Sequence, residues 1–528
     1  MKIKTYILKS ALIFSALFLL SDNASGQDDV MTLLPGSEYV EMNFIPGVHR
    51  LIGNVNFLYQ GNDMYCDSAY YYEDSKVVRA YGHVHINKRD TLNLFCDSLV
   101  YNGNTRKAKL WGNVRVRDNE YKLTTDTLDY DARQGQAHYH HGGRVESIVS
   151  REVLTSRIGY FHPESKNFFF SQDVNYVGES LSMTTDTLKY MYSNRTAYFF
   201  GPTNIEQDST TMYCESGWYH TETGEGSLVQ NAWISRPNDY MSGDTLLYNP
   251  KEKLSIGIGN VHFQDSINKM GFEGDYAYSS DSLGYSFITG HAVAVKEMND
   301  DTLYIHADTL YSLKIDTNYV MKAYYGARIF SNSMQGYADS IVFSQEEERV
   351  RMYDSPIIWS NGSELKGTYM EMHVSDSMIH KVHIIEKASI LMEVEPEKYY
   401  NQIAGKEIEA FFNDNKLYKA FSNGNAMTIF FPEDEQETDT SFVIKRMGMN
   451  RLYSSTLRID VDSNKVTGIS YIEEPDGAFY PMDQLNLEEQ FIPGFNWRYA
   501  LRPKTMEDLF KEDEVVVEEI IEEEYRGE

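Results

Sequence analysis

The sequence is short of cysteine, of basic residues and of long apolar runs, and each shortage excludes a class of protein. Three cysteines in 528 residues cannot build a disulfide framework. Asp and Glu outnumber Lys and Arg by 78 to 48, and the net charge of −30 argues against nucleic acid as a partner. No apolar run after residue 20 is long enough to span a bilayer. The mature chain is therefore predicted to be a soluble protein.

Recognisable catalytic and metal-binding motifs are also missing. The chain has no Gly-x-Ser-x-Gly, no Walker-type loop, no His-Glu-x-x-His and no Cys-x-x-Cys. His83 and His85, and likewise His138 and His140, could place two imidazoles on one strand face, but no third ligand recurs nearby. We therefore predict that the protein has no catalytic residues, no metal and no other cofactor, and is not an enzyme.

The first residues have the three parts of a secretory signal. Lys2, Lys4 and Lys9 make the start basic, residues 11–20 form an apolar core, and Ala24-Ser25-Gly26 offers small residues for cleavage. The apolar core is too short for a membrane anchor. The sequence thus predicts a cleavable signal peptide over residues 1–26 and an exported protein.

Two short phrases recur along the chain with a period of about thirty residues. The first phrase, Asp-Ser/Thr-Leu-x-Tyr, begins at Asp97, Asp126, Asp186 and Asp244. The second phrase, Gly-Asn-Val or a close variant, begins at Gly53, Gly82, Gly112, Gly143, Gly259 and Gly424. A fixed period of this length indicates one supersecondary unit copied many times, each copy covering its neighbour's apolar face. Function is then expected along an extended surface or groove.

Each repeat is predicted to be a hairpin of two strands. Residues 107–117 and 121–130 alternate apolar and polar side chains, and Asp118-Asn119-Glu120 lies between them as a turn. The central glycine is expected to bend or bulge its strand. The predicted fold is therefore all-β: an elongated repeat array of about thirteen hairpins, each rising about 9.6 Å, which is twice the strand separation.

The repeats also suggest boundaries along the chain. The array is placed at residues 45–480, after the signal peptide (1–26) and a leader (27–44). A C-terminal closing segment (481–507) and an acidic tail (508–528) follow. The tail is expected to be disordered or weakly helical until a partner binds.

Leucine and tyrosine of the first phrase are candidates for the inward face. Because side chains alternate along a strand, the Asp, Leu and Tyr of one phrase are expected to share a face. Stacked repeats then form an inward ladder of Leu99, Tyr101, Leu128, Tyr130, Leu188, Tyr190, Leu246, Tyr248, Ile341 and Phe343. Two interpretations stay open: the ladder is the packed core of a closed β-array, or it lines an apolar trough between walls that never close.

The aspartates and cysteines of the repeats are given structural roles. An Asp at this position can accept local backbone N–H bonds, so the aspartates are predicted to be structural brackets and not acid/base pairs or calcium ligands. Cys66 and Cys96 are one repeat, hence two strands, apart. A disulfide, whose Cα atoms lie within about 7 Å, is not expected between them.

Three stretches resemble a known family. Residues 45–57, residues 64–69 and the Phe491-Ile492-Pro493-Gly494 region with Arg502-Pro503 resemble the OstA-like (organic solvent tolerance) family, in the form found in Bacteroidetes. The resemblance implies a V-shaped, incompletely closed β-jellyroll of OstA type whose apolar interior carries lipopolysaccharide acyl chains. It also implies a periplasmic location, end-to-end self-association, and inner- and outer-membrane partners of the lipopolysaccharide transport machinery.

The resemblance makes the leading hypothesis a non-enzymatic lipid-binding protein. It would shield the acyl chains of lipopolysaccharide, or lipid A, in the groove lined by the Leu/Tyr ladder and help to carry the lipid to the outer membrane. The alternative is a structural or adhesive β-repeat scaffold of the periplasm or cell surface. An open groove favours transport, and a filled interior favours the scaffold.

Overall fold

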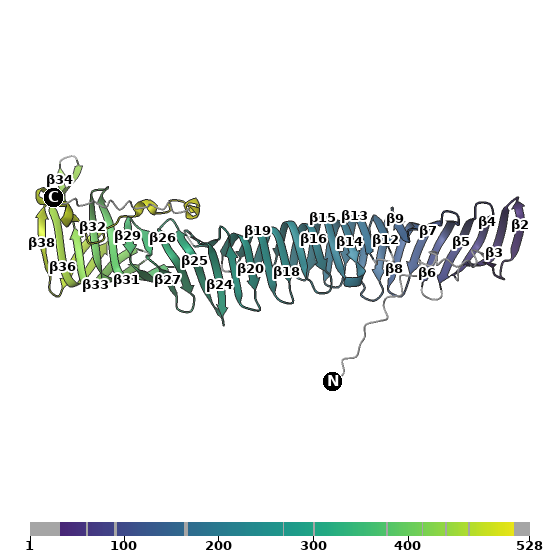
Figure 1. Ribbon diagram of the computed structural model, residues 1–528, viewed down its shortest axis with the longest axis horizontal. Coiled ribbons are helices and arrows are strands. Elements are labelled where there is room, and N and C mark those ends of the chain that lie inside the picture. Colours follow the sequence, from purple (N-terminus) through teal and green to yellow (C-terminus); the bar gives the residue numbers. More distant parts are fainter. Residues whose placement is uncertain are drawn as a thin grey trace, which may run out of the picture. The chain divides into compact units, whose positions relative to one another are not determined.

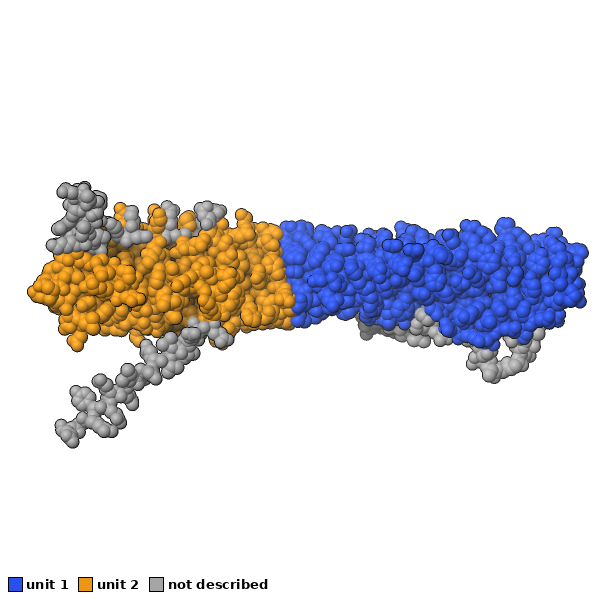
Figure 2. Space-filling view, turned by 90° about the horizontal axis from the view of Figure 1, so that it is seen from above, with its two compact units in different colours: residues 1–258 blue, residues 259–528 orange. Residues whose placement is uncertain are grey.

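The computed structural model describes residues 32–59, 62–88, 92–162, 167–267, 269–298, 301–375, 378–413, 416–438, 441–462 and 465–511. The chain divides into two compact units, residues 1–258 and 259–528 (Figure 2). The predicted signal peptide and most of the predicted acidic tail lie outside the described residues. No helix in the described part of the chain is long and apolar enough to cross a membrane.

Unit 1 is a stack of antiparallel strands that follow one another in chain order (Figure 1). Its elements are β1 (Thr32–Leu33), β2 (Tyr39–Ile45), β3 (Val48–Tyr59), β4 (Asn62–Tyr72), β5 (Val77–Lys88), β6 (Leu92–Asn102), β7 (Lys107–Arg117), β8 (Tyr121–Asp131), β9 (Gln136–Tyr139), β10 (Gly143–Ser147), β11 (Val153–Ser156), β12 (Ile158–His162), β13 (Asn167–Val177), β14 (Leu181–Met191), the 3-10 turn η2 (Tyr192–Asn194), β15 (Thr196–Gln207), β16 (Thr210–His220), β17 (Gly226–Ser235) and β18 (Asp239–Asn249). β19 (Leu254–Asp265) crosses the division between the units.

The predicted repeat is confirmed: each period of about thirty residues is a hairpin of two strands. β3 pairs with β4, β4 with β5, and so on through β8, always antiparallel. Because every strand reverses direction, the turns gather at two edges of the unit. Edge A carries the turns at residues 118–120, 148–152 and 178–180, and edge B carries those at residues 103–106, 132–135 and 192–195.

The strands of unit 1 are sharply bent, so each contributes to two facing walls. Phe168 and Tyr176 are eight residues apart in β13 and would be separated by about 26 Å along a straight strand. Yet Phe168 is the cross-strand partner of Tyr190, and the Tyr190 ring lies 6.3 Å from the Tyr176 ring. The two halves of β13 therefore face each other across a common interior.

The bend is a β-bulge at the second phrase of the repeat. In β7, Gly112 (φ +78°) and Asn113 (φ +48°) are both left-handed, and the register of β7 shifts between Trp111 and Val114. Two facts favour glycine at position 112. Its φ lies in the left-handed region, and a Cβ there would lie 2.4 Å from an Asp97 carboxylate oxygen. The predicted bend at the central glycine is thus confirmed.

The prediction that Asp, Leu and Tyr of one phrase share a face was wrong. In β6, Cys96 is buried, Asp97 is exposed and Leu99 is buried again, so the inward positions are three residues apart at the bend. Strict alternation fails here because the chain turns a corner between Phe95 and Ser98, where the register shifts. Asp97 lies on the outside of the corner, while Leu99 faces the interior.

Two consecutive strands of unit 1 are interrupted at the corner. β9 and β10 both pair with β8, one on each half, and are separated by residues 140–142. β12 pairs with β9 and β11 pairs with β10, so the next strand is interrupted at Arg157. At this place the two walls are joined by short loops, whereas β13 and β14 cross the corner as continuous strands.

Unit 2 also consists of antiparallel strands, which are longer toward its end (Figure 1). Its elements are β20 (Met270–Ser280), β21 (Tyr285–Thr289), β22 (Val293–Glu297), β23 (Thr302–His306), β24 (Thr309–Ile315), β25 (Asn318–Phe330), β26 (Met334–Ser344), β27 (Arg349–Tyr353), β28 (Ile357–Ser360), β29 (Ser363–Lys366), β30 (Tyr369–Ser375), β31 (Met378–Glu395), β32 (Tyr399–Asn413), β33 (Lys416–Phe430), the hairpin β34 (Glu433–Thr438) and β35 (Ser441–Arg446), β36 (Gly448–Asp462), β37 (Lys465–Ile472), β38 (Asp476–Pro481), and the 3-10 turns η3 (Met482–Gln484), η4 (Leu487–Gln490), η5 (Tyr499–Leu501) and η6 (Met506–Phe510).

After β38 the chain returns across unit 2 as a C-terminal strap, residues 485–511 (Figure 1). The strap crosses a row of directly paired side chains on one face of the sheet. The row consists of Gln335, Trp359, Glu364, Leu391, Gln402, Ile429 and Arg451. Paired residues share a face, and the neighbouring row through Ile358, Leu365 and Ile390 is buried on the opposite face. This wall is therefore covered on both sides.

Polar side chains of that row hold the backbone of the strap. Gln402 Oε1 accepts from the Ile492 N–H at 2.9 Å, and Gln402 Nε2 donates to the Gln490 carbonyl at 2.7 Å. Glu364, fully buried, accepts from the Arg498 N–H at 2.9 Å and from Trp359 Nε1 at 3.0 Å. Ile492 completes an apolar cluster with Leu391, Ile429, Phe431 and Met449. The closing segment predicted from the sequence thus packs on the sheet.

The predicted domain boundaries stay predictions, but two facts bear on them. β1 and all of β2 except Ile45 lie inside the predicted leader, yet both strands pair with β3 as part of the strand array. Asp508, the first residue of the predicted acidic tail, lies in η6, where it forms a capping box with Thr505.

Candidate functional site

The predicted leucines lie in a closely packed interior row of unit 1. Leu99 pairs with Leu110 and Leu110 pairs with Leu128; farther along, Phe170, Leu188 and Phe199 are paired in turn. Leu228 pairs with Leu246 in the same way. The exposed fractions of Leu99, Leu128, Leu188 and Leu246 are 3, 2, 1 and 0%. In this conformation the walls touch along the leucine row.

The predicted tyrosines form a second row, which lies two residues nearer to edge B on each strand than the leucine row. Large and small residues alternate along much of it, which lets a ring lie over the small residue of the next strand. The row runs through Tyr101, Ala108, Tyr130, Ala137, Phe161, Phe168, Tyr190, Ala197, Tyr219, Gly226 and Tyr248. Tyr130 and Tyr190 are buried, whereas Tyr101 and Tyr248 are half-buried.

The last two predicted residues lie apart from the other eight, in unit 2. Ile341 is buried between Ala323 and Met352, and Phe343, half-buried, lies between Met321 and Val350. The structure thus brings eight predicted residues into two rows of one wall and places the other two in a separate unit. Whether any of them contacts lipid stays a prediction.

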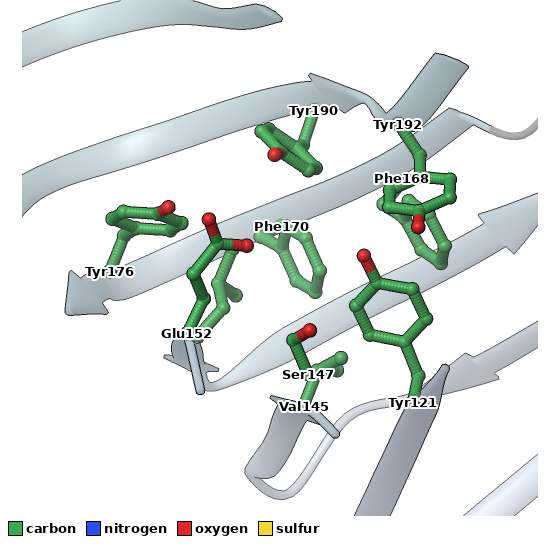
Figure 3. Close-up of a pocket in the computed structure, with 10 residues that line it drawn as sticks. Tyr121, Val145, Ser147, Glu152, Phe168, Phe170, Tyr176, Tyr190 and Tyr192 are labelled. Atoms are coloured by element: carbon green, nitrogen blue, oxygen red, sulfur yellow. The ribbon is translucent and has the colours of Figure 1, made fainter. Parts of the chain in front are cut away.

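A small cavity lies between the walls where the tyrosine row reaches Tyr190 (Figure 3). Its volume is about 30 Å³, and its apolar lining includes Phe168, Phe170 and Tyr176. Val145, Ser147, Glu152 and Leu154, from the interrupted strands and the turn between them, line it on the wall of Tyr176, which pairs with Leu154. Such a volume holds about one water molecule, whereas sites for drug-sized ligands measure about 300–1,000 Å³.

Polar groups from the two edges meet above this cavity. Tyr192, on edge B, donates a hydrogen bond from its hydroxyl to Glu120 Oε2 on edge A at 2.6 Å. Arg195, also on edge B, donates to the Tyr121 hydroxyl at 3.2 Å and lies 3.6 Å from Glu152 Oε2. The Tyr121 and Tyr192 rings meet edge to face at 5.0 Å. These contacts join turns that are 72 and 74 residues apart.

The tyrosine hydroxyls at the cavity stay protonated. Burial is the main cause that raises the pKa of Tyr121, Tyr176, Tyr190 and Tyr192 above the ordinary value of 10. At Tyr176 the negative charge of Glu152 adds to this effect. The hydroxyls are therefore neutral donors and acceptors, and Arg195 is the cation of the group.

Sequence reasoning missed most of the cavity. Tyr190 was predicted, but Tyr121, Glu152, Tyr192 and Arg195 lie in turns or at strand ends, outside the repeated phrases. A usable signal was present: the histidine-rich break at residues 138–143 interrupts the strand alternation beside these residues.

Where the structure describes them, the three cysteines and the possible metal ligands show no sign of a reactive or metal-binding site. Cys66, Cys96 and Cys214 are free and buried at the corner, and burial raises the pKa of Cys66 and Cys96 to about 12. The absence of a Cys66–Cys96 disulfide agrees with the two-strand repeat. Within the residues that the structure describes, no group of three or more His, Cys, Asp or Glu could hold a metal ion.

Comparison with known proteins gives one family match. Residues 39–186 match the family model described as OstA-like protein. No curated protein matches. Among solved structures the chain is similar to LptH from Pseudomonas aeruginosa, described as the LptA homologous periplasmic component of the conserved lipopolysaccharide transport device. That similarity has 12% identity and a TM-score of 0.20, and covers 25% of this chain and 92% of LptH. The resemblance to the OstA-like family is thus confirmed over residues 39–186, the segment that runs from β2 into β14.

Proposed function

We propose that the protein is a non-enzymatic, periplasmic lipid carrier that shields the acyl chains of lipopolysaccharide between the walls of its repeat array. The observation that carries the proposal is the continuous inward row from Tyr101 to Tyr248, in the unit that contains the OstA-like match. A ligand held at one point is usually bound in an enclosed pocket with a few placed polar groups. A continuous apolar face instead suits a ligand that moves along the array.

The packed leucine row limits where an acyl chain lies. Leu99, Leu128 and Leu188 are 3% exposed or less and form the floor of the interior. Acyl chains are therefore proposed to lie nearer to the edges, along the tyrosine row and its cavity. The phosphorylated head group would stay outside, which suits a chain with a net charge of −30.

The proposal includes transport partners and end-to-end contact. β1 and β2 pair with β3 and together form the first edge of the sheet in unit 1. β2 exposes large apolar side chains, with Met42 71% and Ile45 56% exposed. An exposed edge strand accepts another strand by backbone hydrogen bonding. This edge is thus proposed to meet a second copy or a membrane component of the lipopolysaccharide transport machinery, and the carrier to help deliver the lipid to the outer membrane.

Photo-crosslinking in cells tests the proposal. A photoreactive residue at Tyr130 or Tyr190 should capture species that contain lipid A. The matched control is Lys189, which lies on the opposite face of β14 beside the Phe169 and Tyr198 rings. Equal capture from position 189, or none from both inward positions, would contradict an internal lipid path.

A second function is favoured by one observation. The leucine row is closed along its length, as expected for a structural or adhesive scaffold of the periplasm or cell surface. A scaffold would give no lipid crosslinks from either tyrosine, and its loss would leave the outer-membrane barrier intact.

A further inference from the structure

Several contacts between edges A and B meet beside the cavity in unit 1. On edge B, Tyr192 and Arg195 belong to the turn after β14; on edge A, Glu120 precedes β8 and Glu152 precedes β11. Arg195 also lies 3.4 Å from Glu222 Oε1, which belongs to edge B. One arginine thus links carboxylates of both edges, and the Tyr192 hydroxyl adds a second link.

Breaks in two strands lie beside these contacts. β9 and β10, and likewise β11 and β12, are interrupted at the corner, so the halves that line the cavity are joined to the other wall by loops. Gly142, in the first of these loops, has a φ of +95°, and no atom lies within 4 Å of the position that a Cβ would take. Movements of walls commonly occur at a few residues in such loops.

The closed cavity is too small for a lipid. At about 30 Å³ it holds about one water molecule, yet its lining of Phe168, Phe170, Tyr176 and Tyr190 suits an aliphatic chain. A chain can occupy this place only if the walls separate. The groups that oppose separation at the mouth are the side-chain contacts of Tyr192 and Arg195 with edge A.

We propose that Glu120, Glu152, Tyr192 and Arg195 form an edge latch that controls lateral uptake of an aliphatic chain into unit 1. The inference rests on the proposed function and deepens it, because it names where a chain passes between the walls. When the latch opens, the wall of edge A, with β10 and β11, moves away from the wall of edge B, and the tyrosine row becomes accessible at Tyr190. When it closes, the chain is sealed from water.

The latch predicts faster uptake in variants that loosen it. Tyr192→Phe removes one hydroxyl and keeps the ring that packs on Tyr121, while Arg195→Gln removes the central charge. The full-length protein is mixed with a fluorescent anthroyloxy fatty acid, and association is followed by stopped flow. We expect the association rate to rise about tenfold in Arg195→Gln, which corresponds to about 1.4 kcal/mol, and less in Tyr192→Phe.

Arg144→Gln is the matched control. Arg144 lies on β10 beside the cavity-lining Val145, but it pairs with Glu146 of its own strand at 2.6 Å. Its variant should take up the fatty acid at the wild-type rate.

Suppose that the wild-type protein binds the fatty acid and that Arg195→Gln and Tyr192→Phe bind it at the wild-type association rate. The latch proposal is then wrong, and the proposed lipid function is unaffected. Should wild-type protein bind no probe at all, both the latch and the proposed function are overturned. Tyr192→Phe decides the matter if Arg195→Gln does not fold.

Discussion

The Asp97 carboxylate accepts a hydrogen bond of 2.8 Å from the side-chain amide of Asn113, across the outside of a strand corner. The two residues are sixteen apart, and the same separation joins Glu38 to Asn54, Asp67 to His83, Glu215 to Asn231 and Asp275 to His291. At these positions the acid thus braces the bulge of the second phrase. Asp67, Asp97 and Asp275 are structural brackets as predicted, but their partners are side chains and not the local backbone N–H groups that we expected.

The bracket predicts that the corner glycine is more sensitive to substitution than the acid. Gly112→Ala forces a Cβ against Asp97 and strains a left-handed residue, so the local opening free energy of β7 should fall by about 1–3 kcal/mol. Asp97→Ala should have a smaller effect and should relieve part of the Gly112→Ala penalty in the double variant. Hydrogen exchange of β6 and β7 measures these effects.

Gly362→Ala serves as the control for that experiment. Gly362 has a φ of +76° but nothing within 4 Å of an added Cβ. It therefore reports the backbone strain without the carboxylate. Equal losses at positions 112 and 362 would show that the bracket contributes nothing.

The closed leucine row predicts a large penalty for an interior truncation. Leu188, 1% exposed, lies between Phe170 and Phe199, so Leu188→Ala should lower the opening free energy of β14 by about 2–5 kcal/mol. Lys189→Ala, on the opposite face, should change it little. A mild effect at position 188 would instead indicate the open, wetted trough that the sequence left possible.

The buried Glu364 predicts how firmly the strap is held. Glu364→Ala leaves the Arg498 N–H and Trp359 Nε1 without their acceptor, which costs about 1–3 kcal/mol. Trypsin should then cut faster at Arg498 and Lys504. Glu371→Gln is the control, because Glu371, on β30, pairs with Arg351 on β27. Unchanged cleavage in Glu364→Ala would show that the strap is held by its apolar contacts alone.

His306 predicts that the end of the strap loosens in acid. Its ring lies 4.7 Å from the Phe510 ring, and Nδ1 is 2.8 Å from the Ala292 carbonyl. Burial is the main cause that lowers the pKa of His306 below 6.5; Arg328 and His291 lower it further, and Asp308 opposes them. Release of η6 exposes the imidazole, restores the ordinary pKa and so takes up a proton.

The sign of the pH effect follows from that proton. The contribution of His306 to docking is fully present above pH 6.5 and is lost as the pH falls through the lowered pKa. Hydrogen exchange at residues 506–511, corrected for intrinsic rates, should therefore accelerate as the pH falls from 7 to 5. His306→Gln should remove this step. An identical step in the variant would assign it to another group.

The sequence predicted the repeat, the hairpin and the bend because each is a local property of alternating residues and turn residues. The prediction failed where the alternation of inward and outward side chains breaks. Asp97 and Leu99 are two residues apart in β6 but face opposite ways, because the corner adds one residue to the alternation. The fixed separation of Asp97 and Asn113 is visible in the sequence, but it indicates a contact only once the bulge is known to bring the two side chains together. Tyr192 and Arg195 could not be predicted, because their partners across the mouth are set by the bend and twist of the walls and not by neighbouring residues.

The path of the strap also imposes an order on folding. In unit 1 each hairpin pairs with the one before it, so the stack can grow one strand at a time while the chain emerges, N-terminus first. The outer face of β26 to β36 is different. Leu391 and Ile429 stay exposed to water until residue 492 arrives, and Glu364 until residue 498. The strap is made after the strands that it covers and protects this face from aggregation, so a chain interrupted before the strap would expose an apolar strip.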